Sequence, residues 1–197
     1  MDNEIYRKYI KNFDVNLLDC KLLGQGRNGI VFTLPENVVI KICFDAKSCK
    51  DEFYILNKIG NNEFFPKVYG MTGNYMIRDY VDGIPLKDYI KKHGLNKNLS
   101  IKILELFDEF QKLEFSKQDI RCKDIMVGLD GRLMIIDPKK CYTKKRDFPR
   151  HLSKGLYKLG VLDYFMLIVK EERPWLYNRW NVKVRKYIVE KQKEYEN

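Results

Sequence analysis

Residues 115–127 read Phe-Ser-Lys-Gln-Asp-Ile-Arg-Cys-Lys-Asp-Ile-Met-Val, and residues 135–137 read Ile-Ile-Asp. The two stretches place three carboxylates, Asp119, Asp124 and Asp137, in a segment that is otherwise of strand or loop type. Carboxylate oxygens are hard ligands, which Mg²⁺ uses beside phosphate groups. Asp137 directly follows two isoleucines, so we expect it at a strand end, facing out of an apolar core. The segment therefore predicts a site that binds a metal ion beside a phosphate group.

A glycine-rich motif lies nearer the N-terminus. Gly24, Gly26 and Gly29 have the spacing G-x-G-x-x-G, which dinucleotide-binding folds share. In those folds the motif opens a helix, whereas here it runs into Ile30–Thr33, which is strand-like. A glycine turn between two strands lets backbone N–H groups approach phosphate without interference from a Cβ atom. Taken alone, an ordinary glycine-rich hairpin explains the motif equally well.

Lys41 ends the apolar run Val-Val-Ile-Lys. Burying an unpaired ammonium group is costly, so Lys41 has to reach solvent or meet an anion. Glu52, on the helix expected next, is a candidate partner. Taken alone, Lys41 is better explained as a solvent-facing strand residue.

The chain changes character near residues 80–86, where Gly83 and Pro85 lie. The front part is strand-rich with one main helix, and the back part is mainly helical, which predicts an α+β fold of two lobes. The expected helices are 1–17, 47–59, 99–113, 150–169 and 181–195, and the expected strands lie in 18–45, 75–81, 125–127 and 133–136.

Taken in order, these motifs resemble the protein-kinase superfamily over roughly residues 20–140. The resemblance implies a two-lobed protein-kinase-like fold, with an antiparallel-sheet N-lobe at 1–82 and a reduced, mainly helical C-lobe at 83–197. The trimmed C-lobe is similar to those of Rio, lipopolysaccharide-core and aminoglycoside kinases. The matching residues are Gly24, Gly26, Gly29, Val31, Lys41, Glu52, the hinge Tyr75–Gly83, Asp119, Asp124 and Asp137.

The resemblance also implies roles for single residues. The glycine loop with Val31 would cover the ATP phosphates, and Lys41, held by Glu52, would contact the α- and β-phosphates. Backbone groups of Asp79, Tyr80 and Val81 would meet the adenine.

In the back lobe, Asp119 would orient the acceptor hydroxyl and take its proton. Arg121 stands where the family has a lysine that neutralises charge on the transferred phosphoryl group. Asp124 and Asp137 would hold Mg²⁺, with Mn²⁺ as an alternative.

The sequence departs from the family pattern at several of these positions. His-Arg-Asp reads Lys117-Gln118-Asp119, so a phosphorylated activation loop would lack its standard arginine partner. The metal-binding Asn is Asp124, which adds negative charge. Asp-Phe-Gly reads Asp137-Pro138-Lys139, and proline fixes φ there. Arg78 stands where many kinases have an apolar residue.

The chain has 197 residues, 37 Lys plus Arg against 27 Asp plus Glu, and a net charge of +10. This excess favours acidic partners. The basic segment 139–158 predicts binding of an acidic protein or RNA, although a solvated basic face explains it equally well. The aromatics Trp175, Tyr177 and Trp180 are better explained by packing of the last helix than by nucleic-acid contact. Five cysteines without C-x-x-C spacing, no signal pattern and no spanning run predict a cytoplasmic protein.

We therefore expect an ATP- and Mg²⁺-dependent phosphotransferase acting on a hydroxyl, in the first place Ser or Thr of a protein, including the chain itself. A small-molecule kinase acting on a sugar or antibiotic is the first alternative. A pseudokinase that binds nucleotide as a scaffold is the second.

Overall fold

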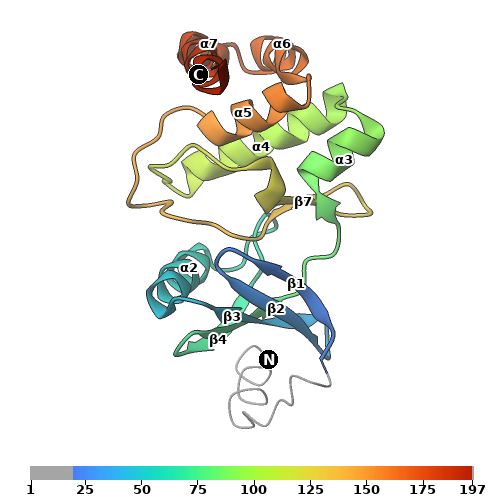
Figure 1. Cartoon of the computed structure of the whole chain (residues 1–197), viewed down its shortest axis with the longest axis vertical. Coiled ribbons are helices and arrows are strands. Elements are labelled where there is room, and N and C mark those ends of the chain that lie inside the picture. The colour runs from blue at the N-terminus through green and yellow to red at the C-terminus, as the bar shows by residue number, and fades with distance from the viewer. Residues whose placement is uncertain (1–19, 197) are drawn as a thin grey trace. The chain divides into compact units, whose positions relative to one another are not determined.

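The structure is a computed structural model that describes residues 20–196. The helix expected at residues 1–17 lies outside the described residues. The chain divides into two compact units, one built from the residues up to Val81 together with Asp137–Lys139, and the other from the remainder. Figure 1 labels their elements.

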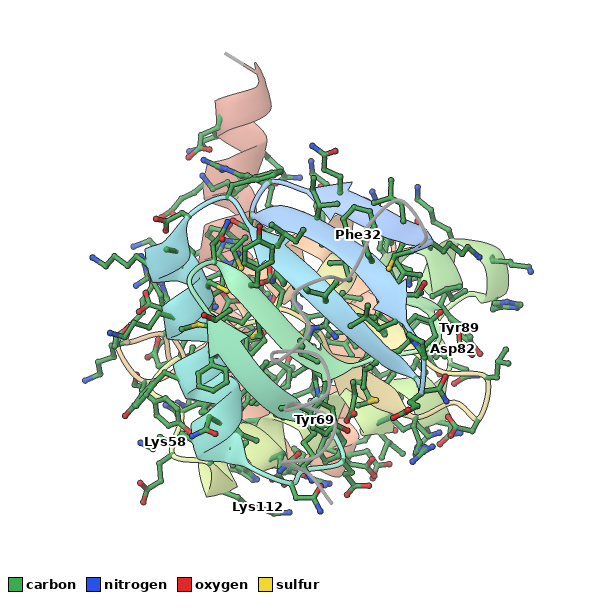
Figure 2. All side chains as sticks on the ribbon, turned by 90° about the horizontal axis from the view of Figure 1, so that it is seen from below. Phe32, Lys58, Tyr69, Asp82, Tyr89 and Lys112 are labelled. Atoms are coloured by element: carbon green, nitrogen blue, oxygen red, sulfur yellow. The ribbon has the colours of Figure 1, made fainter. Side chains whose placement is uncertain are left out.

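The first unit is an antiparallel five-stranded sheet in the order β1-β2-β3-β5-β4. Its central strand β3 is buried almost throughout, because it has a neighbour on each side. A small apolar cluster centred on Ile40 and Ile77 forms one layer of the core, and Phe32 and Tyr69 pack against it. Figure 2 labels these two rings on β2 and β4. The strands are β1 (Leu22–Gly26), β2 (Gly29–Leu34), β3 (Val38–Cys43), β4 (Val68–Thr72) and β5 (Tyr75–Asp79).

One helix of this unit, α2 (Ala46–Ile59), packs against β3, β4 and β5. The Asp45 carboxylate begins it by accepting the Ser48 N–H at 2.8 Å, which satisfies an amide that the helix itself leaves without a partner. Gly60 ends it with φ of +68°, a conformation that glycine adopts without strain. The inner face of α2 buries Leu56 and also Glu52.

The second unit combines a small sheet with a group of helices. Its sheet has the order β6-β7-β8, and α4 supplies the main apolar stripe of the core. The elements are β6 (Ile84–Pro85), α3 (Leu86–His93), α4 (Lys97–Lys112), the 3₁₀ turn η2 (Cys122–Asp124), β7 (Ile125–Val127), β8 (Leu133–Ile135), α5 (Arg150–Lys158), α6 (Leu162–Glu172) and α7 (Pro174–Glu196).

Trp180 is the most deeply buried side chain of the last helix. Trp180 is fully buried, and its ring packs edge-on against Phe107 of α4 at 4.8 Å between centroids. Trp175, one turn earlier, is 46% exposed. The packing expected for the aromatics of the tail is therefore confirmed for Trp180.

The α+β class is confirmed, with three local differences. The helix expected at 150–169 is two helices, because Gly160 at φ +71° closes α5. The N–H groups of Gly160 and Val161 return to the carbonyls of Tyr157 and Leu156, which is the Schellman arrangement. The last helix begins at Pro174 and not at 181, and both α3 and β4 were not expected. In the described part of the chain, none of the helices has the length and apolar character needed to cross a membrane.

We expect Trp180→Ala to lower the free energy of unfolding by about 3–5 kcal/mol, because it leaves a cavity in a closely packed core. Trp175→Ala, the matched control, should cost about 1 kcal/mol or less because its ring is half exposed. Urea unfolding followed by circular dichroism measures both. Equal losses would show that α7 is held by contacts other than the Trp180 ring.

Candidate functional site

The first unit buries an ammonium group between two carboxylates. Lys41, on β3, is only 6% exposed, so the solvent-facing alternative is wrong. Its Nζ donates to Glu52 Oε2 at 2.5 Å and lies 3.3 Å from Asp137 Oδ1. The expected pairing of Lys41 with Glu52 is present. Their role toward a nucleotide stays a prediction.

Asp137 is held from both sides. Its second oxygen, Oδ2, lies 3.1 Å from the Nζ of Lys139. Burial alone would raise the pKa of Asp137, but the ammonium groups of Lys41 and Lys139 outweigh burial and hold the pKa at about 2. Asp137 is therefore an anion throughout the physiological range. It belongs to the first unit although it follows β8 in the chain.

Glu52 and Asp137 both contact Lys41, but their pKa values differ because Glu52 is more deeply buried. Burial raises the pKa of Glu52 to about 7, against the attraction of Lys41 and with the help of the Asp137 charge. Burial lowers the pKa of Lys41, but the two carboxylates outweigh it and the pKa ends above its usual value. Lys41 and Asp137 are therefore charged, and Glu52 takes up a proton near neutral pH because burial disfavours its charged form.

Two buried polar atoms of this unit have no hydrogen-bond partner among the described residues: Glu52 Oε1 and Arg78 Nε. Arg78 is 5% exposed and donates through Nη1 to the carbonyl of Asp79 at 2.9 Å. Buried polar atoms are rarely left unsatisfied, so this region accommodates further polar partners such as water or ligand atoms.

The segment expected to meet adenine already uses most of its N–H groups. The Asp79 N–H donates to Lys67, and the Tyr80 N–H donates to the carbonyl of Asn37 at 2.8 Å. The Asp79 carboxylate accepts from the Lys67 N–H at 3.0 Å and from the Tyr69 hydroxyl at 2.5 Å. These bonds give Asp79 and Tyr80 structural roles, and contact of the segment with adenine stays a prediction.

The three motif glycines differ in what surrounds them. A Cβ atom on Gly29 would lie 2.2 Å from the carbonyl oxygen of Ile42, so the pairing of β2 with β3 requires glycine there. A Cβ atom on Gly24 or Gly26 would meet nothing within 4 Å, and neither residue has a positive φ. Packing within the described residues thus does not explain these two glycines. Val31 pairs with Gly24 on one side and Lys41 on the other, which joins the glycine loop to the ammonium group.

In the second unit, hydrogen bonds from His151 hold the Asp119 carboxylate. Its side chain is fully buried and accepts the backbone N–H of His151 at 2.8 Å, while the imidazole Nδ1 of His151 contacts its other oxygen. His151 lies in the first turn of α5, whose positive dipole end favours a carboxylate. The loop is held in place by Gln118, whose N–H donates to Arg146 and whose side chain donates to Phe115.

Asp124 is paired with Arg121 inside the same unit. Arg121 Nη2 donates to Asp124 Oδ1 at 3.0 Å, and Nε contacts the other oxygen. The carbonyl of Asp124 accepts the N–H of Ile136 at 3.0 Å, which fixes the turn η2 to the end of β8. Arg121 thus neutralises Asp124 here, and a role on a transferred phosphoryl group stays a prediction. Neighbouring Cys122 is inert, because burial raises its pKa to about 12.

His151 is the residue that sequence reasoning missed. Its only signal was its place directly after Pro149 and Arg150, at the start of a predicted helix, and nothing in the sequence joins it to Asp119.

The carboxylates suit a hard divalent cation. Among residues 20–196, however, no group of three or more His, Cys, Asp or Glu side chains comes together to hold one. Asp137 of the first unit and Asp124 of the second each offer a carboxylate of the kind that Mg²⁺ takes beside phosphate oxygens and water. A metal-binding role for either stays a prediction.

No protein-family model matches the chain. A Bacillus subtilis (strain 168) protein named "Putative serine/threonine-protein kinase YrzF" is 23% identical over 123 residues. The match covers 59% of this chain and 57% of that protein, so it spans little more than half the length of either. This distant relationship supports a kinase-like enzyme at a coarse level.

The raised pKa of Glu52 predicts how stability depends on pH. The folded state keeps a proton that the unfolded state releases between pH 4.5 and about 7, so this contribution to stability is complete below pH 4.5 and is lost as the pH rises through 7. Glu52→Gln cannot lose a proton, so we expect its free energy of unfolding to fall less than that of the wild type between pH 5 and pH 7.5. Urea unfolding at several pH values measures the difference, in which the contributions of the two histidines cancel. Parallel curves would contradict the assignment.

Proposed function

We propose that the chain is an ATP- and divalent-metal-dependent phosphotransferase that moves the γ-phosphoryl group to a hydroxyl of Ser or Thr in a protein. The observation that carries the proposal is the ammonium group of Lys41, buried between Glu52 and Asp137 on a strand next to a glycine loop. A structural core gains little from such a group, whereas a triphosphate needs a fixed cation. The kinase name of the Bacillus relative supports the same reaction class.

The first unit would bind the nucleotide. Open space above Gly24 and Gly26 suits the close approach of phosphate oxygens to backbone N–H groups. Lys41 would donate to the α- and β-phosphates, and Val81 would contact the base. Asp137, an anion at every physiological pH, would hold the metal. A bound divalent cation supplies charge neutralisation at the phosphates.

The second unit would supply the groups that act on the acceptor. Each oxygen of Asp119 has two lone pairs and uses one of them toward His151. Because the side chain is fully buried, an acceptor hydroxyl would have to displace part of its cover to reach the other. Asp119 would orient that hydroxyl and take its proton while His151 keeps the carboxylate in place. Asp124 would serve as a metal ligand, and Arg121, which pairs with Asp124 here, would neutralise charge on the transferred phosphoryl group.

A nucleotide-binding scaffold without transfer is a second candidate, favoured by one specific observation. Asp119 and Asp124 already have cationic or N–H partners within the chain, which lowers their readiness to act on a substrate. Nucleotide binding without phosphoryl transfer would identify this alternative.

We expect Lys41→Ala and Asp119→Asn each to lower phosphoryl transfer by about 10²-fold or more, since one removes a fixed cation and the other the proton acceptor. Mass spectrometry after incubation with MgATP and a generic protein acceptor, together with a radiolabelled transfer assay, measures the effect. Lys50→Ala and Asp51→Asn on the exposed face of α2 are the matched controls and should leave the rate unchanged. Near-normal transfer by both site variants would overturn the proposal.

The glycines provide an independent test. Gly26→Ala should leave the melting temperature within a degree or two while it weakens ATP binding several-fold, because the added methyl group occupies only the open side of the loop. Gly29→Ala should lower the melting temperature, because its Cβ collides with the backbone of β3. Thermal unfolding with and without MgATP measures both. Unchanged ATP affinity in Gly26→Ala would place the phosphates elsewhere.

A further inference from the structure

The second unit carries a cationic groove between α5 and α7, two helices that pack against each other. Two neighbouring hollows form it. One is lined by Lys145, Arg146, Arg150, Lys183, Lys186 and Tyr187, and the other by Lys154, Tyr157, Lys158, Ile188, Lys191 and Gln192. We call the two together the α5–α7 groove.

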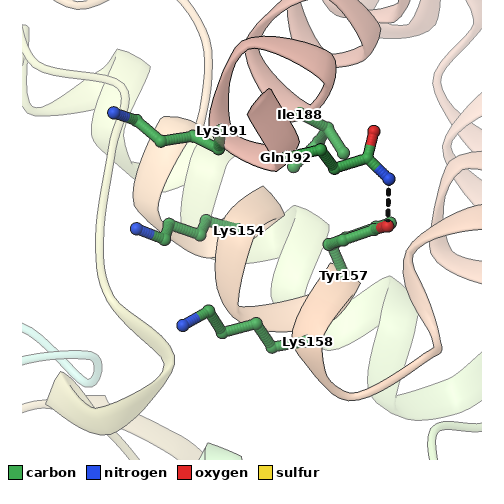
Figure 3. A pocket seen from close by; sticks show the side chains of 6 residues that line it. All are labelled: Lys154, Tyr157, Lys158, Ile188, Lys191 and Gln192. Carbon is green, nitrogen blue, oxygen red and sulfur yellow. Dashed lines mark hydrogen bonds between the residues drawn. The ribbon is translucent and has the colours of Figure 1, made fainter. Parts of the chain in front are cut away.

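The second hollow is lined by Ile188, Tyr157 and Gln192 together with three lysines, whose side chains Figure 3 draws. Ile188 and the ring of Tyr157 form the floor, and Gln192 donates to the Tyr157 hydroxyl and so fixes that ring. The ammonium groups of Lys154, Lys158 and Lys191 point to the same side in Figure 3, away from the Tyr157–Gln192 bond. A ligand here would find a place for one apolar side chain beside a row of positive charges.

The two hollows share one row of cations along α5. Arg150 lines the first hollow, and Lys154 and Lys158 line the second. They are spaced four residues apart, so they lie on one face of the helix, about 6 Å from one to the next along its axis. The two hollows are lined by eight cationic side chains and two acidic ones, Asp147 and Glu190. Lys183 is paired with Asp147 and Lys191 with Glu194, and the remaining excess of positive charge favours anions.

We propose that the α5–α7 groove docks an acidic segment of the protein acceptor, with carboxylates on the cationic row and an apolar side chain on the floor formed by Tyr157 and Ile188. Carboxylates on alternate residues of an extended peptide are about 6.6 Å apart, which matches the spacing of the row. That the segment belongs to the protein acceptor rests on the proposed function, whereas the docking of an acidic segment does not.

The aromatic rings of the first hollow are occupied within the protein, whereas Tyr157 in the second hollow is 42% exposed. Single-stranded nucleic acid needs exposed ring faces on which bases stack. Tyr187 is only 6% exposed, the guanidinium of Arg150 lies 4.7 Å from its ring centroid, and Phe148 packs against it at 6.2 Å. This ring is therefore used within the protein and offers no stacking platform.

The groove is joined physically to Asp119 through α5. His151, which holds Asp119, is the next residue after Arg150, which lines the groove. A segment bound along the Arg150–Lys158 row therefore lies on the same helix whose first turn contacts the expected proton acceptor. This continuity is the reason for assigning the groove to the acceptor and not to an unrelated partner.

The test is binding of a fluorescein-labelled 12-residue peptide in which Glu and Leu alternate, measured by fluorescence anisotropy without nucleotide. We expect binding that weakens as salt rises, and a loss of about fivefold in Lys154→Gln/Lys158→Gln, because each exposed ion pair contributes a factor of about 2 to 3. The matched control, Lys91→Gln/Lys92→Gln, removes the same charge from the exposed face of α3 and should leave the affinity unchanged.

Two further probes separate the sources of binding. A peptide with Gln in place of Glu should bind more weakly, because it keeps the apolar side chains and loses the charges. A 12-nucleotide oligouridylate should bind more weakly than the acidic peptide. Tighter binding of the RNA that is lost in the groove variant would overturn the proposal in favour of a nucleic-acid site. Equal binding of the acidic peptide to the groove and control variants, or no binding at low salt, would overturn it outright.

A kinetic measurement keeps this inference separate from the proposed function. With a serine placed in the acidic peptide, the groove variant should raise KM about fivefold and leave kcat and ATP hydrolysis unchanged. Peptide binding without any phosphoryl transfer by the wild type would overturn the proposed function and leave the docking site standing. Transfer with the same KM in both proteins would support the proposed function and overturn the docking site.

Discussion

A buried ammonium group keeps its charge only with anions beside it, and Lys41 is such a group. This requirement joins three parts of the first unit: β3 supplies the lysine, α2 supplies Glu52, and the residues after β8 supply Asp137. Lys41 contacts both carboxylates and Lys139 contacts Asp137, so Asp137 keeps its charge while burial raises the pKa of Glu52. Nucleotide binding at this place would act on a charge arrangement that the fold has already assembled.

In the second unit a helix terminus stabilises a buried carboxylate, whereas in the first unit a lysine does so. Asp119 is fully buried and stays in place because the first turn of α5 donates a backbone N–H and an imidazole to it. The same helix carries Arg150, Lys154 and Lys158 along the α5–α7 groove. One short element thus holds the expected proton acceptor and presents a surface for an acidic partner. Substitutions along α5 are therefore the most direct way to separate docking from chemistry.

Prediction from the sequence succeeded where local patterns carry the information. The apolar stripe of α4 and the hairpin β7–β8 follow from periodicity and turn residues. It failed for the helix at 150–169, which Gly160 divides into two. A single glycine inside an apolar pattern is weak evidence for a helix end unless its φ is known to be positive. The prediction did not anticipate that His151 contacts Asp119 or that Arg121 pairs with Asp124, because these contacts depend on how the loop around residues 115–124 folds against α5.

The α+β class and the order of the glycine loop, Lys41, Glu52 and the three aspartates could be predicted from the chain alone, because composition, periodicity and spacing are its own properties. Three facts required the folded structure: Lys41 is buried and not solvent-facing, Gly29 alone among the motif glycines is required by packing, and Asp119 and Asp124 have partners inside the chain. Burial, pKa and hydrogen bonding depend on which distant residues surround a side chain, and spacing along the chain does not contain that information.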